Sequence, residues 1–76
     1  MKLSYDPRYN VAYIRFYEKR GQVTTIKVSD DMNIDIAPDG TVYGVELLNA
    51  KEQLTADHGA LIVESGGQRR EITLVA

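Results

Sequence analysis

Three oxygen-bearing side chains stand at alternate positions, at Asp31, Asn33 and Asp35. Calcium loops of the helix-flanked type begin in this way, because alternate carboxylate and amide oxygens point at the ion. Such a loop next needs a glycine and, at its twelfth position, a bidentate glutamate, but Ile36 and Val42 stand there. Asn33 and Asp35 are therefore predicted to be the outward residues of a strand, and no metal or cofactor is expected.

Proton transfer would depend on His58, the one histidine, and on scattered carboxylates. A general base needs an orienting partner and a nucleophile within hydrogen-bond distance. The chain contains no G-x-S-x-G turn, no phosphate-binding glycine loop before a lysine and no HExxH motif. His58 is interpreted as a surface-loop residue, and an enzyme is not expected. A small metal-dependent hydrolase that uses Asp6, Asp30, Asp35 and His58 is the weakest functional hypothesis.

Aromatic and basic side chains alternate in the segment 11–17, where a period of two puts Tyr13, Arg15 and Tyr17 on one strand face. RNA-binding sheets stack bases on such rings and hold phosphates with nearby basic side chains, here Lys27. Tyr and Arg are equally typical of protein interfaces. The net charge of −2 argues against a nucleic-acid partner. Tyr13, Arg15, Tyr17 and Lys27 are therefore predicted to contact a protein.

The elements that would position these residues are mostly strands, because the dominant hydrophobic period is two. Alternating segments are 2–5, 11–17, 22–29, 32–37 and 41–48, and the runs 60–65 and 70–76 flank Gly66-Gly67 as a last hairpin would. A helix across 60–64 is the competing interpretation. The segment 49–59 suits one short helix with Asn49 as its N-cap. Gly44 in mid-strand indicates a bulge or the close approach of another backbone.

These segments predict a mainly β fold, α+β at the margin. It would be an antiparallel meander of about five strands, with a C-terminal hairpin and one short helix. Residues 1–76 are expected to form a single small domain, a meander over 1–50 followed by an extension over 51–76.

A chain of 76 residues is short for a self-sufficient core. It has no cysteine, which excludes disulfides and thiolate zinc sites. A homodimer or a small protein partner is therefore favoured. With no signal-like N-terminus and no apolar run near the roughly 20 residues that span a bilayer, a cytoplasmic protein without membrane contact is expected.

The order of several short motifs resembles a small bacterial and archaeal family known as domain of unknown function 2283. The matching motifs are Tyr5-Asp6-Pro7, Ala12-Tyr13-Ile14-Arg15, Asp39-Gly40 and the run from Val42 to Ala50. Arg8-Tyr9-Asn10 stands where the family usually has acidic residues, and the tail from Lys51 lies outside the pattern. The resemblance implies a β-rich fold and no assigned activity. Some members are encoded beside small toxin-like proteins, which implies an antitoxin-type partner as an alternative.

The leading hypothesis is a non-enzymatic β-rich module that self-associates or binds a protein through Tyr13, Arg15 and Tyr17. A nucleic-acid-binding or antitoxin-like regulatory protein that acts with a partner is the second hypothesis. The hydrolase is the third.

Overall fold

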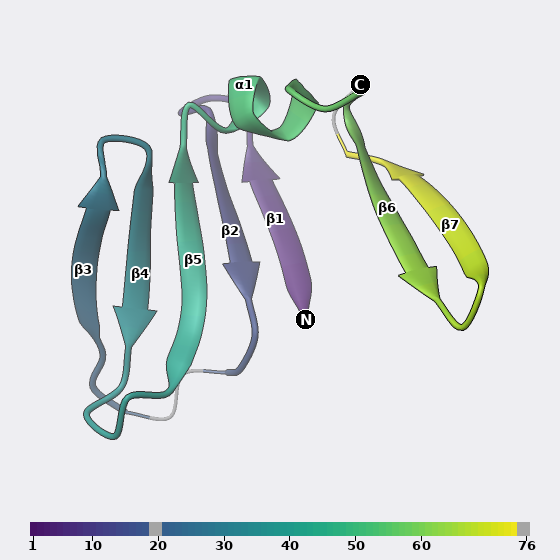
Figure 1. Cartoon of the computed structure of the whole chain (residues 1–76). Coiled ribbons are helices and arrows are strands. Elements are labelled where there is room, and N and C mark those ends of the chain that lie inside the picture. The colour runs from purple at the N-terminus through teal and green to yellow at the C-terminus, as the bar shows by residue number, and fades with distance from the viewer. Residues whose placement is uncertain (19–20, 75–76) are drawn as a thin grey trace.

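The computed structural model describes residues 1–18 and 21–74, which form one five-stranded antiparallel sheet, a separate hairpin and a short helix (Figure 1). The sheet strands are β1 (Lys2–Asp6), β2 (Val11–Arg15), β3 (Thr24–Ser29), β4 (Met32–Ile36) and β5 (Val42–Leu48). Helix α1 (Ala50–Thr55) leads to the hairpin of β6 (Ala60–Ser65) and β7 (Gln68–Thr73). The predicted mainly β class is confirmed, and 60–65 is a strand, not a helix. Residues 19–20 of the predicted charged loop and 75–76 of the predicted last strand lie outside the described residues.

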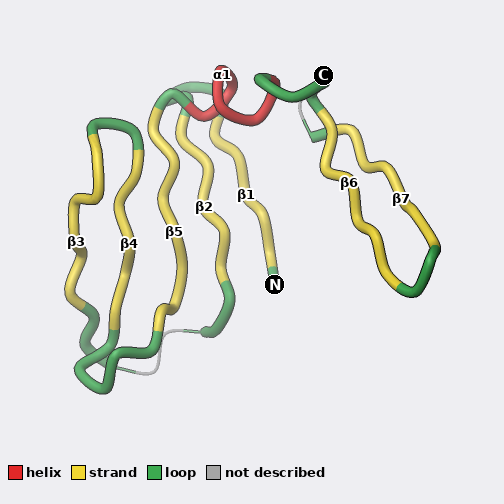
Figure 2. The backbone as a smooth tube through the Cα atoms, viewed as in Figure 1, coloured by secondary structure: helices red, strands yellow, loops and turns green. Residues whose placement is uncertain are grey.

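The strands of the sheet lie in the order β1-β2-β5-β4-β3 (Figure 2). A β1–β2 hairpin and a β3–β4–β5 meander are joined by the pairing of β2 with β5, so the order is not strictly sequential. β1 and β3 are the two edges. The β4–β5 turn is tight: the Gly40 N–H donates to the Ala37 carbonyl at 3.0 Å, with Gly40 at φ 92°.

One face of the sheet carries an aliphatic row that crosses every strand. Residues directly opposite one another in successive strand pairs share a face. The register therefore aligns five residues in the order β1 to β3: Leu3, Ile14, Val45, Ile34 and Ile26. We call this set the aliphatic row. The other face carries the intervening polar residues.

Helix α1 covers only one end of the apolar face. Its Ala50 joins Ala12 and Leu47 in a small buried core, against which Met32 and Leu54 pack. No large side chain among the described residues is fully buried. Leu3 remains 37% exposed and Ile26 45% exposed at the two ends of the aliphatic row. The apolar face is thus half-buried at its centre and open at both edges.

Asn49 occupies the N-cap position of α1 as predicted, but the side-chain bond to the first turn comes from the β1–β2 turn. Asn49 makes no side-chain cap bond, and its amide donates to Asp31 Oδ1 at 2.9 Å instead. The Oδ1 of Asn10 accepts from the Lys51 N–H at 2.8 Å, and the Asn10 carbonyl accepts from the Ala50 N–H at 2.9 Å. Asn10 thus satisfies two of the free N–H groups of the first helical turn from a distant part of the chain.

The segments 11–17 and 41–48, both predicted as regular strands, differ from that prediction in the structure. β2 stops at Arg15, because Phe16 and Tyr17 bend so that both of their N–H groups donate to the Tyr43 carbonyl. In β5 the pairing register shifts by one residue, so that Val42 and not Tyr43 lies opposite Ile36. This bulge lies next to Gly44, where the sequence indicated one.

Candidate functional site

The Tyr13 side chain crosses the polar face of the sheet from β2 to β4. Its hydroxyl donates to Asp35 Oδ2 at 2.7 Å, and Asp35 Oδ1 accepts from the Thr25 hydroxyl at 2.6 Å. Gly44 on β5 lies beneath the ring. A Cβ there would lie 2.5 Å from Tyr13 Cζ and 2.7 Å from the Ile14 carbonyl oxygen. Gly44 thus allows a side-chain link across four strands, and both the Tyr13 ring and the backbone of β2 approach it closely.

This environment raises the pKa of Tyr13 to about 12. Desolvation of the phenol is the largest cause, followed by its hydrogen bond to Asp35 and by the negative charges of Asp35 and Glu46. Tyr13 is consequently a neutral donor at physiological pH. Asp35, which is only 8% exposed, is held between two hydroxyl donors. The arrangement stabilises the sheet, and the raised pKa keeps the Tyr13 phenol from acting as a nucleophile at neutral pH.

Acidic side chains separate the predicted basic contacts on the polar face. Lys27 stands opposite Asn33, which in turn stands opposite Glu46, and Glu46 is opposite Tyr13. Glu46 Oε1 accepts from the Asn33 amide at 2.8 Å, and Lys27 Nζ lies 3.3 Å from Asp30 at the exposed turn. Arg15 on β2 and Lys27 on β3 therefore do not form one continuous basic surface.

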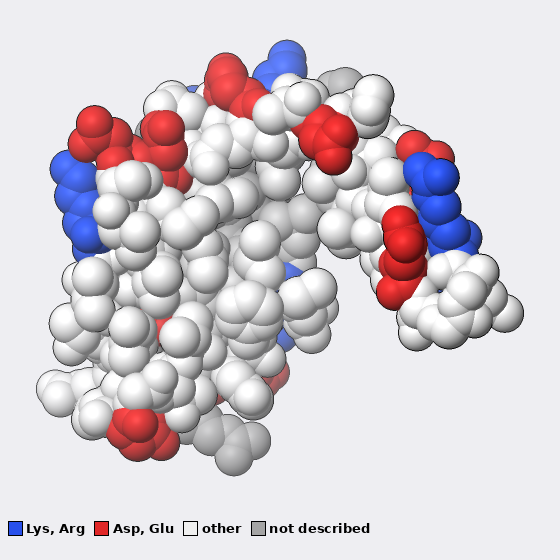
Figure 3. Space-filling view, viewed as in Figure 1, with Lys and Arg blue, Asp and Glu red and all other residues white. Residues whose placement is uncertain are grey.

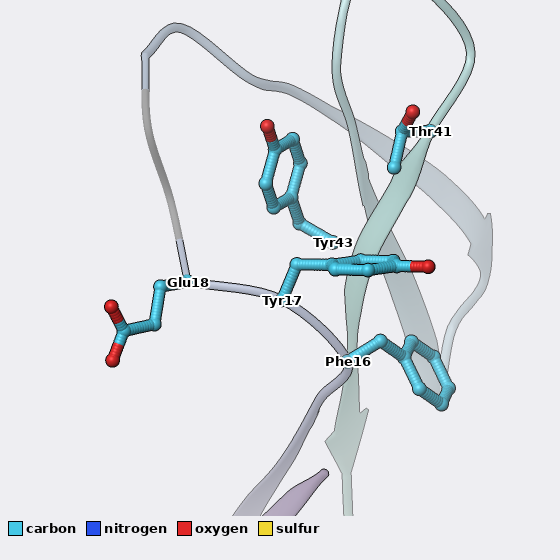
Figure 4. A pocket seen from close by; sticks show the side chains of 5 residues that line it. All are labelled: Phe16, Tyr17, Glu18, Thr41 and Tyr43. Atoms are coloured by element: carbon cyan, nitrogen blue, oxygen red, sulfur yellow. The ribbon is translucent and has the colours of Figure 1, made fainter.

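Tyr17 lies past the end of β2, away from the Tyr13 link. Its ring makes an edge-to-face contact with Tyr43 at a centroid distance of 6.1 Å. With Phe16, Glu18 and Thr41 the two rings line an open hollow (Figure 4), in which the Glu18 carboxylate points away from the rings. Tyr17 is 59% exposed. The predicted interface residues thus divide between two places on the molecule.

The residues of the hydrolase hypothesis lie far apart along the fold. Asp6 ends β1 and accepts from the Arg8 N–H, Asp30 lies in the β3–β4 turn, and Asp35 is in β4. His58, beside Asp57 in the loop before β6, is exposed and has a φ of 61°. Within the described residues no three acidic, histidine or cysteine side chains lie close enough to hold a metal ion.

The apolar face of the sheet is exposed at its edges. The aliphatic row continues toward exposed Phe16 and Val42 at the end away from α1. The bulge in β5 brings Val42 onto this face, whereas strict alternation would place it with Gly44 on the other. Alternation located the other residues on one face. It did not show that α1 is too short to cover them.

The family model described as Protein of unknown function (DUF2283) matches residues 2–51. The chain belongs to this family. No curated protein and no solved structure matches the chain.

The part that matches DUF2283 contains the whole five-stranded sheet and the first residues of α1. Both faces of the sheet therefore lie in the DUF2283 part, whereas the β6–β7 hairpin lies beyond it. No helix in the described part of this DUF2283 chain is long and apolar enough to cross a membrane.

Proposed function

We propose that the protein is a non-enzymatic interaction module that binds another polypeptide on the apolar face of its sheet. The observation that carries the proposal is the aliphatic row, five side chains across five strands with α1 over one end only. A soluble monomer rarely leaves such a contiguous apolar patch open unless it binds something.

The free energy available on this face is substantial. Burial of apolar surface stabilises by about 25 cal/mol per Å². Leu3 and Ile26 at the edges are more than one-third exposed, and Phe16 is 44% exposed. The aliphatic row also crosses all five strands side by side, so one polypeptide surface can contact the whole row at once. This supports a protein partner and not a small molecule.

The test is sedimentation velocity over a concentration series. The wild type is expected to associate, and Ile26→Glu is expected to abolish association because it places a charge on the aliphatic row. The matched control is Lys27→Glu on the opposite face of the same strand, where the side chain is 69% exposed. It changes the charge more than Ile26→Glu does, so an effect of charge alone would be larger in the control.

The surface of Tyr13, Arg15, Tyr17 and Lys27 stays a separate prediction for the interface. The same concentration series on a Tyr13→Ala/Tyr17→Ala double variant distinguishes the two faces. A wild type that stays monomeric at every concentration contradicts self-association through either face.

A further inference from the structure

A second uncovered apolar surface lies on the β6–β7 hairpin. The pairing of Leu61 with Ile72 and of Val63 with Arg70 fixes which side chains share a face. Leu74 continues that face, since its N–H donates to the Gly59 carbonyl at 3.1 Å. The residues Leu61, Val63, Ile72 and Leu74 form what we call the hairpin stripe. Ile72 is 50% exposed and Val63 44% exposed, although an isolated two-stranded hairpin is marginally stable in water.

The hairpin stands away from the sheet and leaves a cleft between them. Where β6 and β7 begin and end, Leu61 and Leu74 face Leu3, Ile14 and Phe16 across a cleft of about 250 Å³ with an entirely apolar lining. The space-filling view shows the hollow between the sheet and the hairpin, and few charged side chains on the sheet beside it (Figure 3). Beyond that base, β6 and β7 pair with each other and with no other described strand.

The chain as a whole exposes more surface than a compact monomer would. Its accessible surface is 5875 Å², whereas a compact protein of 8.5 kDa is expected to expose about 4,700 Å². The radius of gyration is 13.8 Å against roughly 11 Å for a compact chain of this length. The excess of about 1,200 Å² per chain is larger than the roughly 800 Å² that each partner buries in a standard protein interface.

The chain's own hairpin is too narrow to cover its sheet. Two strands span about 10 Å, whereas the five strands of the sheet span about 24 Å. The hairpin lies beside β1 (Figure 1), so folding it down would leave the β4–β3 side open. That side carries Ile26 and Val28, which are 45% and 54% exposed.

We propose that two copies of this chain pack their apolar sheet faces together, and that each hairpin lays its stripe on the β3 side of its partner's face. This inference rests on the proposed function and names its partner. A symmetric dimer uses the same patch on both copies. The twofold axis would run between the two facing sheets, parallel to their strands. This axis reverses the strand order of the second sheet, so that β1 of one copy lies over β3 of the other. The hairpin beside β1 then reaches the partner's Ile26.

The areas fit this arrangement. Five strands of about five residues cover roughly 400 Å² in projection, about half of the roughly 800 Å² that each partner buries in a stable interface. The hairpin adds about 200 Å² in projection, and the uneven surface of the side chains adds further accessible area. Sheet packing alone is therefore small for a stable dimer, and the hairpins bring it into the usual range.

Cysteine cross-linking in the full chain tests the proposal, because the natural sequence has no cysteine. One preparation carries Val63→Cys and a second carries Ile26→Cys, each at an exposed site that tolerates the change. The two are mixed, unfolded and refolded together, treated with a short bismaleimide and analysed by mass spectrometry. We expect a covalent species with the summed mass of the two different chains. The matched control, Lys27→Cys mixed with Val63→Cys, places the thiol on the opposite face and is expected to remain uncross-linked.

Each alternative arrangement gives its own product. Cross-linking of Ile26→Cys only to itself would mean that like strands face each other without hairpin exchange. A Val63→Cys/Ile26→Cys double variant that cross-links internally at monomer mass would mean that the hairpin closes on its own sheet. Either product overturns the exchange, while the wild type can still associate as the proposed function requires. Failure of the wild type to associate in sedimentation overturns both.

Discussion

At the scale of single residues, the Tyr13–Asp35 hydrogen bond is the most informative contact in the sheet. The sequence placed Tyr13 on the polar face and marked Gly44 as a special position, and both predictions describe parts of one arrangement. What alternation could not predict is that the ring lies over Gly44 to reach Asp35, because the partner depends on which strand neighbours β2. The Tyr13 side chain, which was expected to contact a partner, thus hydrogen-bonds within its own chain.

This contact predicts a late-titrating phenol. Because the pKa of Tyr13 is raised from 10.0 to about 12 in the folded protein, the stabilisation is complete below pH 10 and is lost as the pH rises through about 12. The tyrosinate absorbance of the wild type minus that of Tyr13→Phe should show one step near pH 12. Asp35→Asn should move this step to lower pH, since the carboxylate charge is removed. A difference step centred at the ordinary phenol pKa would show that the contact is absent.

At the scale of elements, the strands and the helix were predictable from local patterns, whereas the long-range contacts between them were not. Alternation and turn residues located all of the strands, since a period of two and a Pro-Asp-Gly turn act within a few residues. The helix and its N-cap position at Asn49 were located too, but the residue whose side chain bonds the first turn was not. Asn10, which makes the cap bonds, is separated from Lys51 by 41 positions, and only the pairing of β2 with β5 brings them together.

Asn10→Gly tests this cap without disturbing the backbone. Asn10 has a φ of 55°, which glycine adopts freely, so the change removes only the side-chain bonds. Loss of the bond to the Lys51 N–H should lower the free energy of unfolding by about 1 kcal/mol, measured by urea denaturation. The Asn10 amide is also the main cause of the lowered pKa of Glu52, so that pKa should rise toward its ordinary value in an NMR titration.

Asn49→Gly is the control for the cap. Asn49 also has a positive φ, 48°, and its side chain bonds only the exposed Asp31 carboxylate. It should change stability less and leave the Glu52 pKa where it is. A lowered carboxyl pKa stabilises the fold fully above the ordinary pKa, and this stabilisation is lost as the pH falls through the lowered pKa. The Glu52 part of the difference between the two variants should therefore shrink in acid. If the two variants lowered the free energy of unfolding equally at neutral pH, the bond from Asn10 to the first helical turn would not be a specific cap.

At the scale of the whole molecule, the sequence located an apolar face but not what covers it. The sequence favoured a partner because the chain is short and has no cysteine, so that its own core is small. The structure adds where the unburied surface lies: on the sheet, and on a hairpin that is tethered beside it and does not close over it. Both surfaces belong to one chain, so a second copy supplies complements to both.

Ile72→Glu distinguishes a dimer in which the hairpins are part of the interface from a monomer in which the hairpin contacts no partner. In a monomer, Ile72 is half exposed and a charge there should barely change stability. In the dimer, the charge enters the interface, and stability should fall. A dimer also gains about 1.4 kcal/mol for each tenfold rise in protein concentration, so the urea midpoint of the wild type should rise with concentration. That rise should vanish in Ile72→Glu and persist in Thr73→Glu, the same charge on the other face of β7. A urea midpoint of the wild type that does not change with protein concentration would contradict the dimer. Equal losses of stability in Ile72→Glu and Thr73→Glu would show that the hairpin stripe is not part of the interface.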